Sequence, residues 1–174
     1  EPERGIHAIA VAAETVTRLS MGHVDEDTTF NIGTINGGTA TNIVPDSCVV
    51  TGELRSYDHS KALEYVKNTE KIFAEEADKA GATAEVTHQV HLVAYETPVE
   101  SRTVKDFLKA CEKTGLPGTL TETFGGSDNN SFAKHGIEGL VLSCGMYQAH
   151  STNEYTKIKD LYDGAELIRT LIEL

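Results

Sequence analysis

Positive charge is scarce in this sequence, because 15 lysine and arginine residues stand against 27 aspartate and glutamate residues, for a formal net charge of −12. A surface of that sign repels phosphate backbones and anionic lipid headgroups over about 8 Å at physiological ionic strength. Long apolar runs are also absent, and none approaches the roughly 18 residues that a membrane-spanning helix needs. We therefore expect neither a nucleic acid nor a membrane as a partner.

Cysteine is rare as well, with Cys48, Cys111 and Cys144 at wide spacings among apolar neighbours. An odd number at such spacings fits neither a disulfide framework nor a compact zinc knuckle. We interpret the three as reduced core thiols of a cytoplasmic protein. The chain also has no G-x-S-x-G, C-x-x-C or G-x-G-x-x-G pattern, so a serine or cysteine nucleophile and a dinucleotide fingerprint have no support.

The first 94 residues do contain regular hydrophobic periodicity. Pro2 suits the first turn of a helix, and apolar residues then recur at helical spacing until Gly22 ends the run. Alternating patterns predict strands over 28–35, 48–55 and 84–92, and a second helix runs from about Ser60 to Gly81. The order helix, strand, strand, helix, strand lacks only a leading strand to make a split βαβ sandwich, an α+β domain over 1–94 with two helices on one face of its sheet.

Residues 95–174 follow a different, α/β pattern. Helices are predicted over 101–113, near Ser131 and over 159–174, and they alternate with strands over 119–124 and 139–144. Two strands are too few for a parallel sheet to bury both of its faces. We therefore expect residues 95–174 to be the incomplete part of a larger α/β domain.

His150 has the strongest case for a chemical role. It follows the apolar run 139–144, and active sites of open α/β sheets gather at the carboxyl ends of such strands. The competing interpretation is a solvated or capping histidine. Glu154, four residues further on, is a candidate to orient His150, to bond the neighbouring backbone, or to play no chemical part.

A second candidate site lies where a predicted strand turns into a helix, at Gly125, Gly126, Ser127 and Asp128. The glycines allow a close approach, and the backbone N–H groups of such a turn can face an anionic group of a ligand. The alternative is a plain helix start with Ser127 or Asp128 as the N-cap.

Asn42 and Arg55 are candidates to hold a carboxylate together, because the guanidinium fork of arginine matches two oxygens at once. Alternatively, Asn42 shapes a turn and Arg55 pairs with an acidic neighbour. The histidines other than His150 show no i, i+4 metal pair on a helix, and we interpret them as structural or solvated.

Taken together, these segments resemble the dinuclear zinc exopeptidase family that contains peptidase T, glutamate carboxypeptidase, aminoacylase and succinyl-diaminopimelate desuccinylase. The matching stretches are residues 2–9, 37–46, 52–56, 125–128 and 150–154, in family order across nearly the whole chain. The sequence around 52–57 and 125–130 is most similar to the peptidase-T-like branch.

The resemblance implies that residues 1–94 are a lid and dimerisation domain and that residues 95–174 are the C-terminal portion of the catalytic domain. His150 matches the last zinc ligand of the family, Asn42 and Arg55 match lid residues that contact substrate, and the loop 125–128 matches one that lines the substrate cleft. The remaining zinc ligands and the general base have no match in this chain. The resemblance thus implies a homodimeric metallopeptidase acting on small peptides with two zinc ions.

We expect the chain to be a C-terminal fragment of that enzyme, without a catalytic residue of its own and inactive by itself, since a single imidazole does not hold catalytic zinc. The absence of methionine at position 1 agrees with this expectation of a fragment. A hypothesis from another class is a non-catalytic dimerisation or ligand-binding module built on residues 1–94.

Overall fold

The computed structural model describes residues 1–143 and 145–174. Within it the chain divides into two compact units, Glu1–Ala94 and Tyr95–Leu174, which are described separately below.

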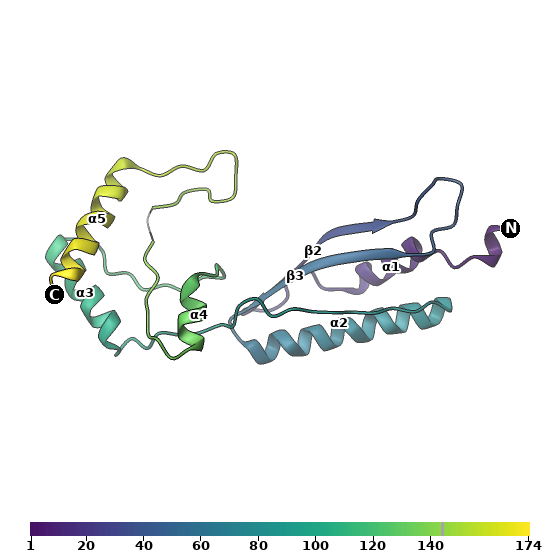
Figure 1. The fold of residues 1–174 in the computed structure, drawn as a ribbon, viewed down its shortest axis with the longest axis horizontal. Helices are drawn as coiled ribbons and strands as arrows, with labels where there is room; N and C mark the ends of the chain where they lie inside the picture. Colours follow the sequence, from purple (N-terminus) through teal and green to yellow (C-terminus); the bar gives the residue numbers. More distant parts are fainter. Residues whose placement is uncertain (144) are drawn as a thin grey trace. The chain divides into compact units, whose positions relative to one another are not determined.

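The first unit is an α+β layer of one antiparallel sheet and two helices (Figure 1). Its sheet has the order β1-β2-β3, and a bulge between Ile32 and Thr34 shifts the register of the long β2–β3 hairpin. In chain order the elements are a short 3-10 turn η1 (Pro2–Arg4), α1 (Ala8–Arg18), β1 (Gly22–His23), β2 (Thr28–Gly37), β3 (Cys48–Ser56) and α2 (His59–Ala80).

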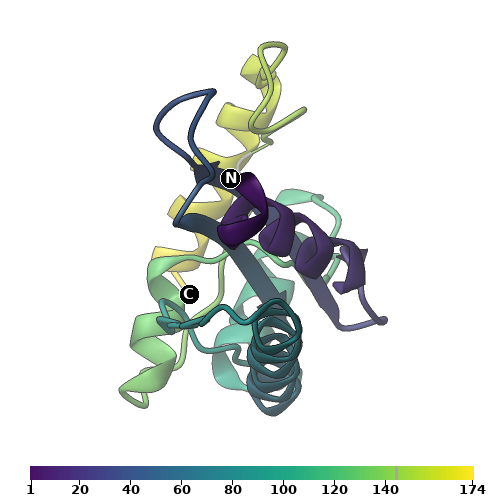
Figure 2. The same cartoon turned by 90° about the vertical axis from the view of Figure 1, so that its right-hand side faces the viewer.

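The two helices lie side by side against the hairpin, as the view along α2 shows (Figure 2). Phe30 of β2 is buried, and its ring centroid lies 5.0 Å from that of Tyr65 on α2. Arg18 at the end of α1 donates hydrogen bonds to both Glu75 and Glu76 of α2. This arrangement confirms the predicted sheet with two helices packed on one face.

The predicted helix that starts at Pro2 is interrupted. Gly5 is extended, with φ −97° and ψ 146°, so the turn at Pro2–Arg4 does not continue into α1. The side chain of Val44 favours glycine here, because a Cβ on Gly5 would make a tight contact of 3.1 Å with its Cγ1. The main helix begins after His7, whose Nδ1 accepts a 3.3 Å hydrogen bond from the N–H of Ala10.

The prediction of a strand over 84–92 is wrong. These residues belong to no strand of the sheet, and the third strand is instead the short β1, which pairs with Phe30 and Thr29 of β2. The physical reason is that a strand exists only where a neighbour completes its ladder of hydrogen bonds. Alternating side chains report the pattern of faces but not the presence of that neighbour.

The second unit is built on two packed helices, α3 (Arg102–Thr114) and α5 (Ile158–Ile172), with the short helix α4 (Asp128–Lys134) between them in the chain. Its core consists of Phe107, Ala110 and Cys111 of α3 with Leu167 of α5. The predicted strand over 119–124 is not formed, nor is the described part, 139–143, of the predicted strand over 139–144; residue 144 lies outside the described residues. The reason is the same, because neither segment has a ladder partner among the described residues.

The two long helices of this unit differ on the side that faces away from the core. Exposed positions of α3 carry charged residues such as Lys105 and Lys109. Helix α5 instead exposes Ile158, Tyr162 and Ile172, with 73, 74 and 82% of their surfaces accessible. Helix α5 thus has an apolar outer side as well as an apolar inner side. Among the described residues, no helix is both long and apolar enough to cross a membrane.

Candidate functional site

His150 lies exposed in an ordered loop of the second unit. The loop is closed by an isolated antiparallel bridge between Tyr147 and Tyr155. Inside it, the backbone N–H of His150 donates a 2.9 Å hydrogen bond to Oε2 of Glu154. The backbone of His150 has a φ of +64°, a conformation in which non-glycine residues are uncommon. The imidazole is therefore presented to solvent from a backbone that Glu154 helps to hold.

Glu154 contacts the backbone of His150 through its carboxylate, which is one of the roles considered for it from the sequence. Its own N–H donates to the carbonyl oxygen of Ser151 at 3.2 Å. The carboxylate of Glu154 thus helps to fix the backbone of His150, which carries the imidazole.

Ser127 is the N-cap of α4. Its hydroxyl accepts a 3.2 Å hydrogen bond from the N–H of Asn129, and its own N–H donates to Oδ1 of Asn130 at 2.9 Å, a reciprocal capping pair. Gly125 donates its N–H to the hydroxyl of Thr123 at 3.0 Å. In this structure the segment 125–128 therefore serves as a capped helix start, the alternative that the sequence left open.

Asn42 and Arg55 are not brought together within the chain. Asn42 lies in the connection between β2 and β3, next to the end of the hairpin where Gly37 pairs with Cys48. Arg55 pairs with Thr29 near the other end, roughly 23 Å along β3 at the usual rise of about 3.3 Å per residue. The two side chains of one copy therefore cannot hold the same carboxylate.

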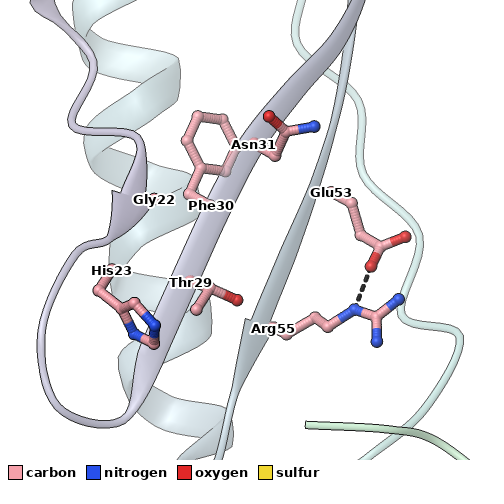
Figure 3. A pocket seen from close by; sticks show the side chains of 7 residues that line it. All are labelled: Gly22, His23, Thr29, Phe30, Asn31, Glu53 and Arg55. Carbon is pink, nitrogen blue, oxygen red and sulfur yellow. Dashed lines mark hydrogen bonds and ion pairs between the residues drawn. The ribbon is translucent and has the colours of Figure 1, made fainter. Parts of the chain in front are cut away.

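Arg55 lies instead in a shallow, open pocket of about 380 Å³ along β1, β2 and β3 (Figure 3). Along β2 and β3, residues two apart share a face, so Thr29, Asn31, Glu53 and Arg55 line this surface while Phe30 points to the helices. Gly22 and His23 of β1, together with Phe30, complete the lining.

The guanidinium of Arg55 donates from Nε to Oε1 of Glu53, two residues earlier on the same strand. This hydrogen bond is the main reason why the pKa of Glu53 is lowered from its ordinary value. The sequence carried the signal for this pair in its period of two, and the pairing matches the alternative of an acidic neighbour. Any anion that binds Arg55 competes with the carboxylate of Glu53.

Among residues 1–143 and 145–174, no group of three or more histidine, cysteine, aspartate or glutamate side chains is placed to hold a metal ion. Cys48 and Cys111 are free thiols, and burial raises the pKa of Cys111. The expectation for Cys144 lies outside the described residues.

Two tyrosines flank His150 in the chain and were not among the predicted site residues. The rings of Tyr147 and Tyr155 are stacked with their centroids 4.9 Å apart and their planes at 10°. The available signal was their placement, one on each side of the polar segment that contains His150.

Comparisons with known proteins show which proteins the chain is similar to. A family model described as a peptidase dimerisation domain, M20_dimer, matches residues 1–81. A tripeptidase from Staphylococcus aureus subsp. aureus Mu50 is 34% identical in a structure that superposes with a TM-score of 0.92, covering 99% of this chain and 46% of its own. The aminopeptidase PepT from Bacillus cereus ATCC 10987 is 35% identical, with a TM-score of 0.86 and the same coverage.

Curated relatives give the same picture. The uncharacterised protein YqjE of Bacillus subtilis strain 168 is 38% identical over 99% of this chain and 47% of its own length. A succinyl-diaminopimelate desuccinylase of Psychrobacter arcticus is 26% identical over 97% of this chain and 42% of its own. The chain thus spans about half the length of the relatives it matches. Its first 81 residues match the dimerisation domain of the M20 peptidases, and nearly the whole chain is similar to solved peptidases.

Proposed function

We propose that this chain is the dimerisation domain and the C-terminal portion of the catalytic domain of a metal-dependent peptidase that hydrolyses small peptides. The observation that carries the proposal is the exposed imidazole of His150, held in an ordered loop of a chain that matches solved M20 peptidases over 99% of its length. Two of those similar structures are described as an aminopeptidase and a tripeptidase, which supports a peptidase-T-like activity on di- or tripeptides.

His150 is the residue of this chain that fits a metal. Its side chain is exposed, and a neutral imidazole nitrogen is a preferred zinc ligand. A structure with a TM-score of 0.73 and 19% identity is described as a dinuclear metal-binding peptidase, which agrees with a metal in this fold. We assign two zinc ions to the whole enzyme. When bound, zinc would supply Lewis-acid chemistry for amide hydrolysis, and His150 would be one of the residues that hold it.

The contribution of the first unit is substrate contact and assembly. Arg55 is proposed to bind a carboxylate or backbone group of the peptide, which requires its guanidinium to exchange Glu53 for the substrate. Asn42 and the segment from Gly125 to Asp128 are proposed to contact substrate at other points. Because Asn42 and Arg55 lie at opposite ends of the hairpin, farther apart than a di- or tripeptide reaches, we propose that they contact substrates bound to different copies of the chain.

The apolar outer side of α5 supports the view that the second unit belongs to a larger domain. Ile158, Leu161, Tyr162, Ile168 and Ile172 recur at helical spacing and are exposed, whereas the opposite side of the helix is packed on α3. Contiguous apolar surface of this kind marks an interaction site. We propose that the remainder of the catalytic domain covers it.

We further propose a homodimer formed through the first unit, supported by the match to a peptidase dimerisation domain. A location in the cytoplasm is supported by the free thiols of Cys48 and Cys111. Sedimentation of the 174-residue chain tests the dimer, with an apparent mass near twice 18.8 kDa expected. A strictly monomeric chain at all concentrations contradicts it.

A non-catalytic dimerisation module is the second candidate for this chain alone. It is favoured by the contacts of α1 and α2 with each other and with the hairpin inside the first unit. Assays of tripeptide hydrolysis separate the two. We expect zinc-dependent turnover, abolished by a chelator, from a protein of the full length of its relatives, and none from the 174-residue chain. Absence of turnover in the longer protein would contradict the peptidase and favour the non-catalytic dimerisation module.

A further inference from the structure

The loop that carries His150 is closed at its base by two tyrosines. The N–H of Tyr147 donates to the carbonyl oxygen of Tyr155 at 3.0 Å, and the N–H of Tyr155 donates back to that of Tyr147 at 3.1 Å. Above this pair of hydrogen bonds the two rings stack, with centroids 4.9 Å apart and an angle of 10° between their planes. Backbone and side chains therefore join the same two residues.

Two further contacts hold the base from outside. The ammonium group of Lys157 lies 4.6 Å from the ring centroid of Tyr147, within the range of a cation–π interaction. The hydroxyl of Thr156 donates to the carbonyl oxygen of Gly145 at 2.6 Å. Contacts at residues 145, 147, 155 and 156 thus join the two segments at which the chain enters and leaves the loop.

The backbone inside the loop needs such ties. Gln148 and His150 both have positive φ, 53° and 64°, and neither is glycine. Residues in this region persist where the surrounding structure over-determines them, often at functional sites. The hydrogen bond from His150 to Glu154 and that from the N–H of Ser151 to the carbonyl oxygen of Gln148, at 3.2 Å, act within the loop. They do not by themselves fix its two ends.

We propose that Tyr147 and Tyr155 are positioning residues that close this loop and set where the imidazole of His150 stands. The proposal rests on the proposed function, in which His150 binds metal, and it assigns to the stacked pair the task of organising that ligand before metal arrives. A metal ligand on a loop needs such support, because its geometry must be held within about 0.5 Å. The tyrosines would act through the loop that carries His150 and not as ligands themselves.

Amide hydrogen exchange of the 174-residue chain, resolved by NMR, tests the closure directly. In Tyr155→Ala we expect the amides of Tyr147 and Tyr155 to exchange about two- to tenfold faster, the range that corresponds to loss of one aromatic pair. In Tyr155→Phe the ring remains, and exchange within about twofold of the parent chain is expected. Tyr162→Ala, on the exposed side of α5, is the matched control and leaves both amides unchanged.

A second measurement separates this proposal from the proposed function. In the protein of the full length of its relatives, zinc affinity should fall about 10- to 100-fold in Tyr155→Ala and recover in Tyr155→Phe. If the two amides exchange in Tyr155→Ala as they do in the parent chain, the tyrosines do not close the loop. If Tyr155→Ala opens the loop but zinc affinity is unaffected, their positioning role is refuted. If His150→Ala leaves zinc affinity unchanged, the proposed function fails, whatever the exchange data show.

Discussion

The carboxylate of Glu154 accepts a hydrogen bond from the backbone N–H of His150, at 2.9 Å across four residues. This contact predicts that Glu154→Ala frees the His150 amide. Its hydrogen exchange should accelerate about two- to tenfold, because a net hydrogen bond contributes about 0.5–1.5 kcal/mol. Glu154→Gln keeps a carbonyl acceptor at the same reach, so the exchange rate of its His150 amide should lie between those of the parent chain and Glu154→Ala. Equal exchange in all three proteins would show that the bond does not persist in solution.

A second prediction concerns acid stability of the first unit. Hydrogen bonds from Lys79 and then Arg18 lower the pKa of Glu76, and a hydrogen bond from Arg18 lowers that of Glu75. A carboxyl group whose folded pKa lies below its ordinary value of 4.5 stabilises the fold above that value, and this contribution is lost as the pH falls through the folded pKa. Urea unfolding midpoints should therefore decline below about pH 4.5.

The variant Glu76→Gln should reduce that decline and lower stability at pH 7, because it cannot carry the charge that Arg18 and Lys79 bind. Glu85→Gln, at an exposed position after α2, is the matched control and should follow the parent chain. If the urea unfolding midpoints of Glu76→Gln and Glu85→Gln depend on pH in the same way, the ion pairs of Glu76 do not contribute to acid stability.

Two glycines of the hairpin give a matched test of its packing. A Cβ on Gly52 would lie 2.6 Å from the backbone oxygen of Asn31, whereas a Cβ on Gly33 would meet nothing nearer than 3.8 Å. Gly52→Ala should therefore cost about 1–3 kcal/mol in the free energy of unfolding. Gly33→Ala should change it by less than about 1 kcal/mol. Thermal unfolding measures both, and equal losses would contradict the register of β2 and β3.

Leu167 tests the core of the second unit. It is 9% exposed and packs with Phe107 and Cys111, so Leu167→Ala should lower the free energy of unfolding by about 2–5 kcal/mol. Ile172→Ala removes an exposed side chain of the same helix and should cost less than about 0.5 kcal/mol in the 174-residue chain. A larger loss for Ile172 than for Leu167 would mean that the outer side of α5 is covered.

Local signals made the helices predictable from the sequence. Helix α2 ends at Gly81 in the left-handed conformation, with φ +70°, and α3 begins at the capping hydroxyl of Ser101. Each of these features depends on residues within a turn of one another. The β2–β3 hairpin was also predictable, because alternating side chains over 28–35 and 48–55 flank a connection rich in Gly, Asn and Pro.

Features that depend on distant partners were not predictable. The segment over 84–92 alternates like a strand, but alternation does not supply a neighbour. The separation of Asn42 from Arg55 follows from the length of the hairpin, which a comparison of residue types does not reveal. His150 stays a prediction from the sequence, whereas the stacking of Tyr147 on Tyr155 was not predictable, because stacking across a loop has no periodicity.

The proposed function depends on His150 as a metal ligand of the peptidase. It is tested most directly by the bound zinc of the protein at the full length of its relatives, measured with and without His150→Ala. The account predicts that the variant loses at least about 100-fold in zinc affinity, more than removal of an outer partner causes. Zinc affinity in His150→Ala equal to that of the parent protein would contradict it.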